Sequence, residues 1–221
     1  MKILALNGSP RKKGNSAILL NRFLKGAEFS GAETDEEIIE DLNIRGCSGC
    51  LRCNLIKRCY IRDDYWNHLS NKINKADTLV FSAPVYFHHF PANIKKVIDR
   101  FRSFFHVKIT ENGLIHTPWE VWKKNLVLIT SMGSPDQKDA KPMVDLLKFM
   151  VNEMGVSNRL YVLAGTRLAI PKQISMSLEE LEILYKKLDI PVSLAADDHI
   201  RNKKLLKKSY NLGVKLGKRT K

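Results

Sequence analysis

The sequence predicts an α/β fold in which a five-stranded parallel sheet carries helices on both faces. Short apolar runs alternate along the chain with longer stretches whose apolar residues recur at helical spacing. Strands that alternate with helices in this way form parallel sheets through right-handed crossovers. The chain has 221 residues, of which 44% are hydrophobic, enough for one large domain with a core. Because no repeat, low-complexity tract or linker interrupts it, we expect a single domain over residues 1–221.

The first predicted strand lies at residues 2–7, where KILALN is a continuous apolar run typical of a strand buried on both faces. Residues 15–29 follow as a helix, because their apolar residues recur every three to four positions. Further strands are predicted at residues 36–42, 78–84, 125–131 and 159–164. Further helices are predicted at about residues 63–76, 92–105, 139–154, 178–188 and 202–217. Asp63 or Asp64 is available to cap the first of these.

One segment, residues 109–125, interrupts the alternation. Its Asn112-Gly113 pair is a strong hairpin-turn signal, and apolar residues flank it. We therefore expect a short two-stranded excursion bearing Trp119 and Trp122. It either packs on the core as a surface insertion or forms a dimer contact.

Five strands in this rhythm suit the flavodoxin-like doubly wound order 2-1-3-4-5. In such sheets the ligand lies outside the carboxyl ends of the strands, at the switch point between strands 1 and 3. We therefore expect the functional residues in the loops that follow strands 1, 3 and 4.

The composition limits the class of protein. No apolar run approaches the roughly 20 residues that span a bilayer. The opening MKILAL is too short for a signal-peptide core and runs directly into the turn NGSP. We therefore expect a cytoplasmic protein with no membrane partner, in a compartment where thiols stay reduced.

The net charge of +14 indicates either a solvated lysine-rich surface or an anionic partner. The last 19 residues contain eight Lys or Arg and no acid, and four leucines there are spaced for one face of a helix. These leucines are Leu205, Leu206, Leu212 and Leu216. We expect a packed C-terminal helix near residues 202–217 with a basic outer side. No recognised nucleic-acid motif accompanies the charge, so nucleic acid is not the expected partner.

The loop after the first strand, NGSPRKKGNSA at residues 7–17, has the composition of a phosphate site. Gly8 permits a tight turn, and the following helix begins with free backbone N–H groups. Polar side chains suited to a terminal phosphate are Ser9, Arg11, Asn15 and Ser16. The loop lacks the Gly-Lys-Ser/Thr ending of a Walker loop, and it is not a dinucleotide fingerprint.

GSPRKKGNS resembles the phosphate loop of the NAD(P)H-dependent FMN reductase-like branch of the flavodoxin superfamily. The resemblance implies that Ser9, Arg11, Asn15 and Ser16 hold the FMN phosphate. SAPVYFHHFPANIKKVIDRF at residues 82–101 resembles the second flavin-binding segment of the same family. It implies flavin contacts from Pro84, Val85, Tyr86 and Phe87. A flat flavin ring also needs apolar walls and backbone donors. After strand 4, the small residue Gly133 permits close approach of the backbone.

All four cysteines of the chain, Cys47, Cys50, Cys53 and Cys59, fall within 13 positions. Their spacing, C-x2-C-x2-C-x5-C, differs from the two separated C-x-x-C pairs of zinc sites. Disulfides are disfavoured in a reducing compartment. Free thiols without a role need not cluster. A 4Fe–4S cluster fits best, since bacterial ferredoxins use a similar run.

The same spacing is similar to the compact cysteine motif of the iron–sulfur flavoproteins, a group within the FMN reductase-like family. The resemblance covers residues 1 to about 101, and it implies a homodimer or homotetramer. Because parallel strands end at one edge, we expect the cluster beside the flavin pocket. Many flavin reductases of the family carry similar cysteines followed by two acids, as Asp63 and Asp64 are here.

Five basic residues surround the thiols and would steer an acidic electron donor such as ferredoxin. These residues are Arg45, Arg52, Lys57, Arg58 and Arg62. We expect an FMN-dependent oxidoreductase that takes electrons from such a donor through the cluster and passes them to oxygen, peroxide or a quinone. The alternatives are a cluster-free NAD(P)H-dependent FMN or quinone reductase, and a non-enzymatic protein, either a basic flavin-binding regulator or a nucleic-acid-binding module. No general acid or base is identified.

Overall fold

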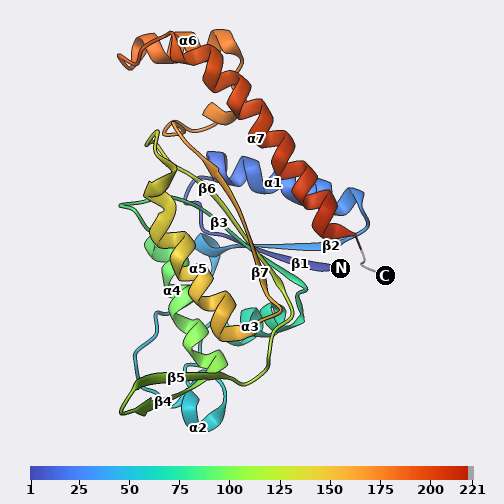
Figure 1. Ribbon diagram of the computed structural model, residues 1–221, viewed down its shortest axis with the longest axis vertical. Helices are drawn as coiled ribbons and strands as arrows, with labels where there is room; N and C mark the ends of the chain where they lie inside the picture. Colours follow the sequence, from blue (N-terminus) through green and yellow to red (C-terminus); the bar gives the residue numbers. More distant parts are fainter. Residues whose placement is uncertain (219–221) are drawn as a thin grey trace.

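The main sheet is parallel and five-stranded, with the order β2-β1-β3-β6-β7 (Figure 1). The computed structural model describes residues 1–218, so the last three residues of the basic C-terminal stretch lie outside the described residues. The strands are β1 (Lys2–Asn7), β2 (Glu33–Ile38), β3 (Thr78–Pro84), β6 (Asn125–Ser131) and β7 (Arg159–Gly165). All neighbouring pairs are parallel. This order is the predicted 2-1-3-4-5, so the flavodoxin-like fold class is confirmed.

Helices cover both faces of the sheet, as the apolar runs predicted. On one face lie α3 (Trp66–Lys75), α4 (Ala92–Arg100) and α5 (Lys141–Met154), which share a core with Leu4 and Leu6 of β1. On the other face lie α1 (Asn15–Phe29) and α7 (Leu194–Gly217), which share a core with Ile3 and Ala5. Successive residues of β1 thus point to opposite faces, and both faces are buried.

A hairpin stands apart from the main sheet. Its antiparallel strands are β4 (Phe105–Thr110) and β5 (Gly113–Pro118), so it begins four residues before the predicted excursion. Trp119 and Trp122 follow the hairpin rather than lying on it, and Trp122 is buried in the core. The hairpin lies beside the short helix α2 (Cys53–Ile56), at the far end of the molecule from α6 (Leu178–Lys187) (Figure 1).

Several predicted boundaries are wrong for identifiable reasons. The second strand was predicted at residues 36–42, but Ile39–Asp41 form a 3-10 turn beyond its end. β2 is an edge strand in which Glu33, Asp35 and Glu36 are exposed, and its single apolar residue, Ile38, lies at its end rather than in its middle. The last helix begins at Leu194, eight residues earlier than predicted, because Ala195 is also buried. The helix predicted at 92–105 changes to a 3-10 turn at Phe101–Phe104.

The remaining predicted helices differ less. Residues 139–140 belong to a 3-10 turn that precedes α5, and α3 begins at Trp66. Asp64 is not the N-cap of α3, although its carboxylate accepts a hydrogen bond from the backbone N–H of Trp66 at 3.1 Å. None of the helices within residues 1–218 is both long and apolar enough to cross a membrane.

Candidate functional site

A cavity of about 220 Å³ lies at the carboxyl ends of β1, β3, β6 and β7. It includes eight of the nine residues that the sequence predicted as flavin contacts. These eight are Ser9, Arg11, Asn15, Ser16, Pro84, Val85, Tyr86 and Gly133. The remaining residue, Phe87, does not line it. The position is the switch point where the chain leaves β1 toward one face of the sheet and β3 toward the other.

The loop between β1 and α1 wraps closely around the amino end of the helix. The N–H of Gly8 donates to the carbonyl of Ser82 at 2.8 Å, which ties the loop to β3. Gly14 caps α1 in an extended conformation and contributes no side-chain cap. A β-carbon at Gly14 would lie 2.7 Å from the hydroxyl of Ser9. The bare backbone therefore leaves the first N–H groups of α1 available to an anion.

Ser16 provides the clearest sign of a missing polar partner. Ser16 lines the cavity and is only 1% exposed. Its hydroxyl has no hydrogen-bond partner within residues 1–218. Buried hydroxyls are normally paired, so an unpaired one at the first turn of a helix fits a phosphate oxygen. Ser9 is also buried, but its hydroxyl is bonded to the backbone of Arg11.

Asn15 lines the same cavity, yet its side chain is occupied by other parts of the chain. Its amide nitrogen donates to the carbonyls of Leu168 at 3.1 Å and Ile170 at 2.9 Å. Its oxygen accepts from the N–H of Ile174 at 3.0 Å. These bonds use both amide protons, so the side chain of Asn15 holds the loop after β7 in place rather than offering donors to a phosphate.

The segment after β3 forms a tight turn. Tyr86 and His89 exchange two backbone hydrogen bonds, at 2.9 and 3.0 Å. Phe87 and His88, between them, both have positive φ angles of 49° and 62°. The turn directs the side chain of Phe87 away from the cavity and leaves it fully exposed. Pro84 and Val85 form the cavity wall, with the Val85 N–H bonded to Ser131.

The loop after β7 completes the cavity through Leu168 and Ala169, which the sequence did not predict. Arg167 holds this loop because its Nε and Nη2 both donate to the buried carboxylate of Asp198 on α7. Tyr185 donates to the same carboxylate at 2.5 Å, and its burial together with this bond raises the pKa of Tyr185 to about 12. The C-terminal helices thus fix one wall of the cavity.

The four cysteines surround a second, smaller cavity of about 20 Å³ with mainly apolar walls. Cys47 and Cys50 are exposed, Cys59 is half-buried, and Cys53 is buried at the start of α2. Burial raises the pKa of the Cys53 thiol, and the nearby positive charge of Arg102 offsets only part of this rise. A backbone hydrogen bond from Arg52 lowers the pKa of the Cys50 thiol.

Two residues attach α2 to the hairpin. Arg102 donates to the sulfur of Cys53 at 3.5 Å and to the side-chain oxygen of Asn54 at 2.8 Å. Asn54 in turn exchanges two hydrogen bonds with the backbone of Val107 on β4, at 2.8 and 3.0 Å. Cys53, the third cysteine, is therefore held in place by Arg102 and by the attachment of α2 to β4.

A buried ion pair closes the cysteine loop. Arg100 at the end of α4 pairs with Asp64, and both side chains are fully buried. The same guanidinium donates to the carbonyl of Arg45 at 2.8 Å and to that of Ile61 at 3.2 Å. These two carbonyls lie just before the first cysteine and just after the last. Arg100 thus joins both ends of the loop to the helix.

The two cavities lie at opposite ends of α4, contrary to the expectation that they would be neighbours. The flavin-site residues Pro84–Tyr86 precede α4, and Arg100 and Arg102, which line the cysteine cavity, end and follow it. The nine residues of α4, about 13 Å of helix, lie between these two groups of residues. Arg100 bonds the carbonyls of Arg45 and Ile61. The segment between them therefore lies beside the end of α4 rather than at the edge of the sheet.

The cysteines suit an iron–sulfur cluster in number and kind. Among residues 1–218, no three His, Cys, Asp or Glu side chains stand close enough together to hold a single metal ion. A cubane cluster makes a different demand, because each thiolate binds a different iron and the four sulfurs stand further apart. The four thiols stand around one small cavity with Arg100 and Arg102 in its wall, and a cluster there would require the loop to widen beyond the present volume of about 20 Å³.

A family model described as NADPH-dependent FMN reductase matches residues 1–167. An iron–sulfur flavoprotein of Archaeoglobus fulgidus is 35% identical over 106 residues, which is 48% of this chain and 48% of the relative. One from Methanocaldococcus jannaschii is 33% identical over 102 residues, 46% of this chain and 52% of the relative. In these matches the chain spans about half the length of the curated relatives.

Solved structures share the fold. An NAD(P)H:quinone oxidoreductase from Methanothermobacter marburgensis has a TM-score of 0.66 at 16% identity, covering 98% of both chains. An FMN-dependent NADH-azoreductase from Bacillus anthracis, solved in complex with FMN, has a TM-score of 0.65 at 14% identity. That match covers 98% of this chain and all of the azoreductase chain. At these identities the likeness concerns the fold alone.

Proposed function

Because the chain belongs to the NADPH-dependent FMN reductase family, we propose that it binds FMN in the cavity at the carboxyl ends of the strands. The phosphate would lie at the amino end of α1, beside Ser9, Arg11 and Ser16. The flavin ring would lie against Pro84, Val85 and Tyr86, with the backbone at Gly133 close to it. The observation that carries this proposal is the buried, unpaired hydroxyl of Ser16 in that cavity.

The activity we propose is that of an FMN-dependent oxidoreductase. It relays electrons from a ferredoxin-like donor through a 4Fe–4S cluster to FMN, and then to a small acceptor such as oxygen, peroxide or a quinone. The family match, the names of the two archaeal relatives and the four thiols around one cavity support it. We propose the cytoplasm as its location, since the cysteines are free.

The surface around the cysteines has the charge that an acidic donor protein requires. Lys57, Arg58 and Arg62 are exposed, and none of them pairs with a carboxylate within residues 1–218. Arg45 pairs with Asp63, and the Arg52 guanidinium lies 3.9 Å from the centre of the Tyr60 ring. Three unpaired cations beside the thiols would speed encounter with a donor at low ionic strength.

We propose a homodimer or homotetramer, and the separation of the two cavities supports it. Within one chain the length of α4 lies between the proposed cluster and the proposed flavin. We propose that assembly brings the cysteine loop of one subunit to the flavin cavity of another. The fully exposed Phe87, beside the flavin cavity, is an apolar residue available for such a contact.

The competing function is a cluster-free NAD(P)H-dependent FMN or quinone reductase, and anaerobic purification distinguishes the two. We expect bound FMN, about four irons and four sulfides per chain, and rapid flavin reduction by a reduced ferredoxin. Fewer than about two irons per chain together with rapid reduction by NADPH would contradict the cluster-dependent proposal and establish the alternative.

Arg11→Ala tests the phosphate site. Its guanidinium lines the cavity and makes one long hydrogen bond, 3.3 Å to the carbonyl of Ala169, so it is available to a phosphate. We expect FMN to dissociate about ten to a hundred times more readily, since a charged hydrogen bond contributes about 1.5–3 kcal/mol. Fluorescence titration of the apoprotein with FMN measures this. Lys12→Ala removes the adjacent charge outside the cavity and should leave affinity unchanged; equal losses in both variants would show that the loop is misassigned.

A further inference from the structure

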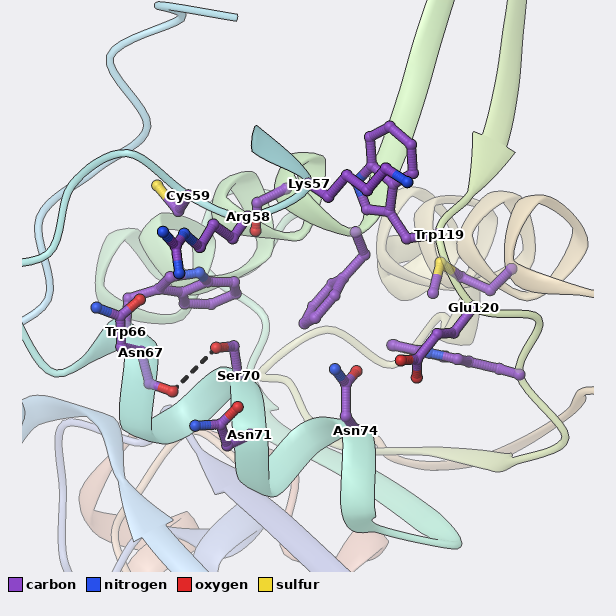
Figure 2. A pocket seen from close by; sticks show the side chains of 14 residues that line it. Lys57, Arg58, Cys59, Trp66, Asn67, Ser70, Asn71, Asn74, Trp119 and Glu120 are labelled. Carbon is purple, nitrogen blue, oxygen red and sulfur yellow. Dashed lines mark hydrogen bonds between the residues drawn. The ribbon is translucent and has the colours of Figure 1, made fainter. Parts of the chain in front are cut away.

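A separate cavity of about 190 Å³, which we call the tryptophan cavity, lies between the end of the cysteine loop, α3 and the segment after β5 (Figure 2). The chain has three tryptophans, and all three, Trp66, Trp119 and Trp122, line it. Its volume corresponds to about six water molecules at roughly 30 Å³ each, the size of a single-ring organic molecule. Cys59 of the cysteine loop also lines it, whereas the flavin cavity shares none of its residues.

The floor of the tryptophan cavity is aromatic and rigid. The ring of Phe104 lies 5.8 Å from that of Trp66 and 5.5 Å from that of Trp122, centre to centre. All three side chains are buried in the core, so they are already fixed before any ligand arrives. A planar aromatic ring could therefore pack against these side chains with little further loss of their conformational entropy.

One side of the cavity is cationic. α2 ends at Lys57 in a left-handed conformation, with φ 57° and ψ 24°, which glycine more commonly adopts. The chain therefore turns sharply, and Lys57 and Arg58 both line the cavity. The Lys57 ammonium lies 5.5 Å from the centre of the Trp119 ring, and Arg58 extends toward Trp66 in Figure 2. An anionic group on a ligand would complement this side.

The other side carries a carboxylate and amides. Figure 2 shows Glu120 and Asn74 pointing into the cavity, across from Arg58. Within residues 1–218, Glu120 forms no salt bridge and the side-chain amides of Asn71 and Asn74 form no hydrogen bond. The indole N–H of Trp119 is buried and likewise has no partner in that part of the chain. Polar groups left unpaired around one cavity indicate a ligand with polar groups at its edge.

We propose that the tryptophan cavity binds a single-ring aromatic acid that carries a hydroxyl opposite its carboxylate. The carboxylate lies toward Arg58 and Lys57, the ring packs on Trp66, Phe104 and Trp122, and the hydroxyl donates to Glu120. Cations at one side and a lone carboxylate at the other select this class over a simple anion, which Glu120 would repel. The site is independent of the flavin cavity, and binding involves no electron transfer.

Titration of the purified protein with 4-hydroxybenzoate tests this site, followed by tryptophan fluorescence and by calorimetry. Because every tryptophan of the chain lines the cavity, we expect saturable quenching that matches the calorimetric isotherm. Arg58→Gln should weaken binding about tenfold, which is the loss of one charge-assisted contact. Lys108→Gln removes the same charge from the exposed face of β4 and should bind as the unmodified protein does.

The polar end of the ligand has its own control. 4-Methoxybenzoate keeps the ring and carboxylate but cannot donate a hydrogen bond, so it should bind several-fold more weakly than 4-hydroxybenzoate. Glu120→Met, which removes the carboxylate acceptor, should reduce this preference to near unity. Absence of saturable binding, equal effects of Arg58→Gln and Lys108→Gln, or a preference unchanged in Glu120→Met would each overturn the proposal. These readouts measure binding directly and require no enzymatic turnover.

Discussion

Replacing Arg100 by methionine is expected to lower the free energy of unfolding by about 3–5 kcal/mol, because it leaves the buried carboxylate of Asp64 without its partner. Both side chains of the pair are fully buried, and the guanidinium also bonds the carbonyls of Arg45 and Ile61. Those carbonyls would lose their donor as well. The cysteine loop should then detach from α4, which proteolysis between residues 45 and 62 would reveal.

Urea unfolding at neutral pH measures the loss, and two further variants make it specific. Arg62→Met removes an exposed arginine from the same loop and should change the stability by less than about 0.5 kcal/mol. The double variant Arg100→Met with Asp64→Leu should recover part of the loss, because a buried pair replaced by apolar groups is often tolerated. A single-variant loss below about 1 kcal/mol would contradict the role of Arg100 as the closure of the loop.

The Arg100–Asp64 pair also predicts a pH dependence. Burial opposes ionisation of Asp64, but hydrogen bonds from Arg100 and from the backbone of Arg45 and Trp66 outweigh it and hold its pKa below the ordinary value. Its stabilising contribution is therefore complete above about pH 3.9, the unfolded value, and is lost as the pH falls through the folded pKa. The stability difference between the unmodified protein and Arg100→Met should thus shrink in acid. An equal difference at pH 7 and pH 3 would contradict this.

The fold was predictable because its signals are local. The apolar runs of β1, β3 and β6 are buried on both faces, so their boundaries follow from composition almost to the residue. The edge strand β7 is only partly buried, but its apolar residues still mark its position. β2 was misplaced because an edge strand of acidic residues has no such run. Its buried Glu37 is paired with Lys72 of α3, a contact that only the folded chain provides.

The candidate sites were predictable where a loop follows a strand directly. Ser9, Arg11 and Ser16 fall within the loop and first helical turn after β1, so sequence position alone put them near the switch point. Leu168 and Ala169 were missed because nothing in their local sequence distinguishes them; they reach the cavity through Asn15, more than 150 residues away. Arg100 was visible only as part of a helix, since its partners lie on a different segment.

Cys53→Ser should remove the proposed iron–sulfur cluster while leaving FMN bound, and this is the second large effect we expect. Cys53 is the buried cysteine of the four, held by Arg102 at the start of α2, so no other thiol can take its place without unfolding that turn. A serine hydroxyl stays protonated near neutral pH and is a much poorer iron ligand than a thiolate.

The measurement is iron and sulfide content after anaerobic purification, with FMN counted from the visible spectrum. We expect about four irons per chain in the unmodified protein, fewer than one in Cys53→Ser, and equal FMN in both, since α4 separates the two cavities. Leu55→Ser changes an exposed residue of the same helix and keeps all four thiols, so its iron content should match the unmodified protein. Full iron in Cys53→Ser would remove Cys53 from the ligand set. Loss of FMN together with iron would show instead that the two cavities depend on one another, which the anchoring of the cysteine loop on the far end of α4 argues against.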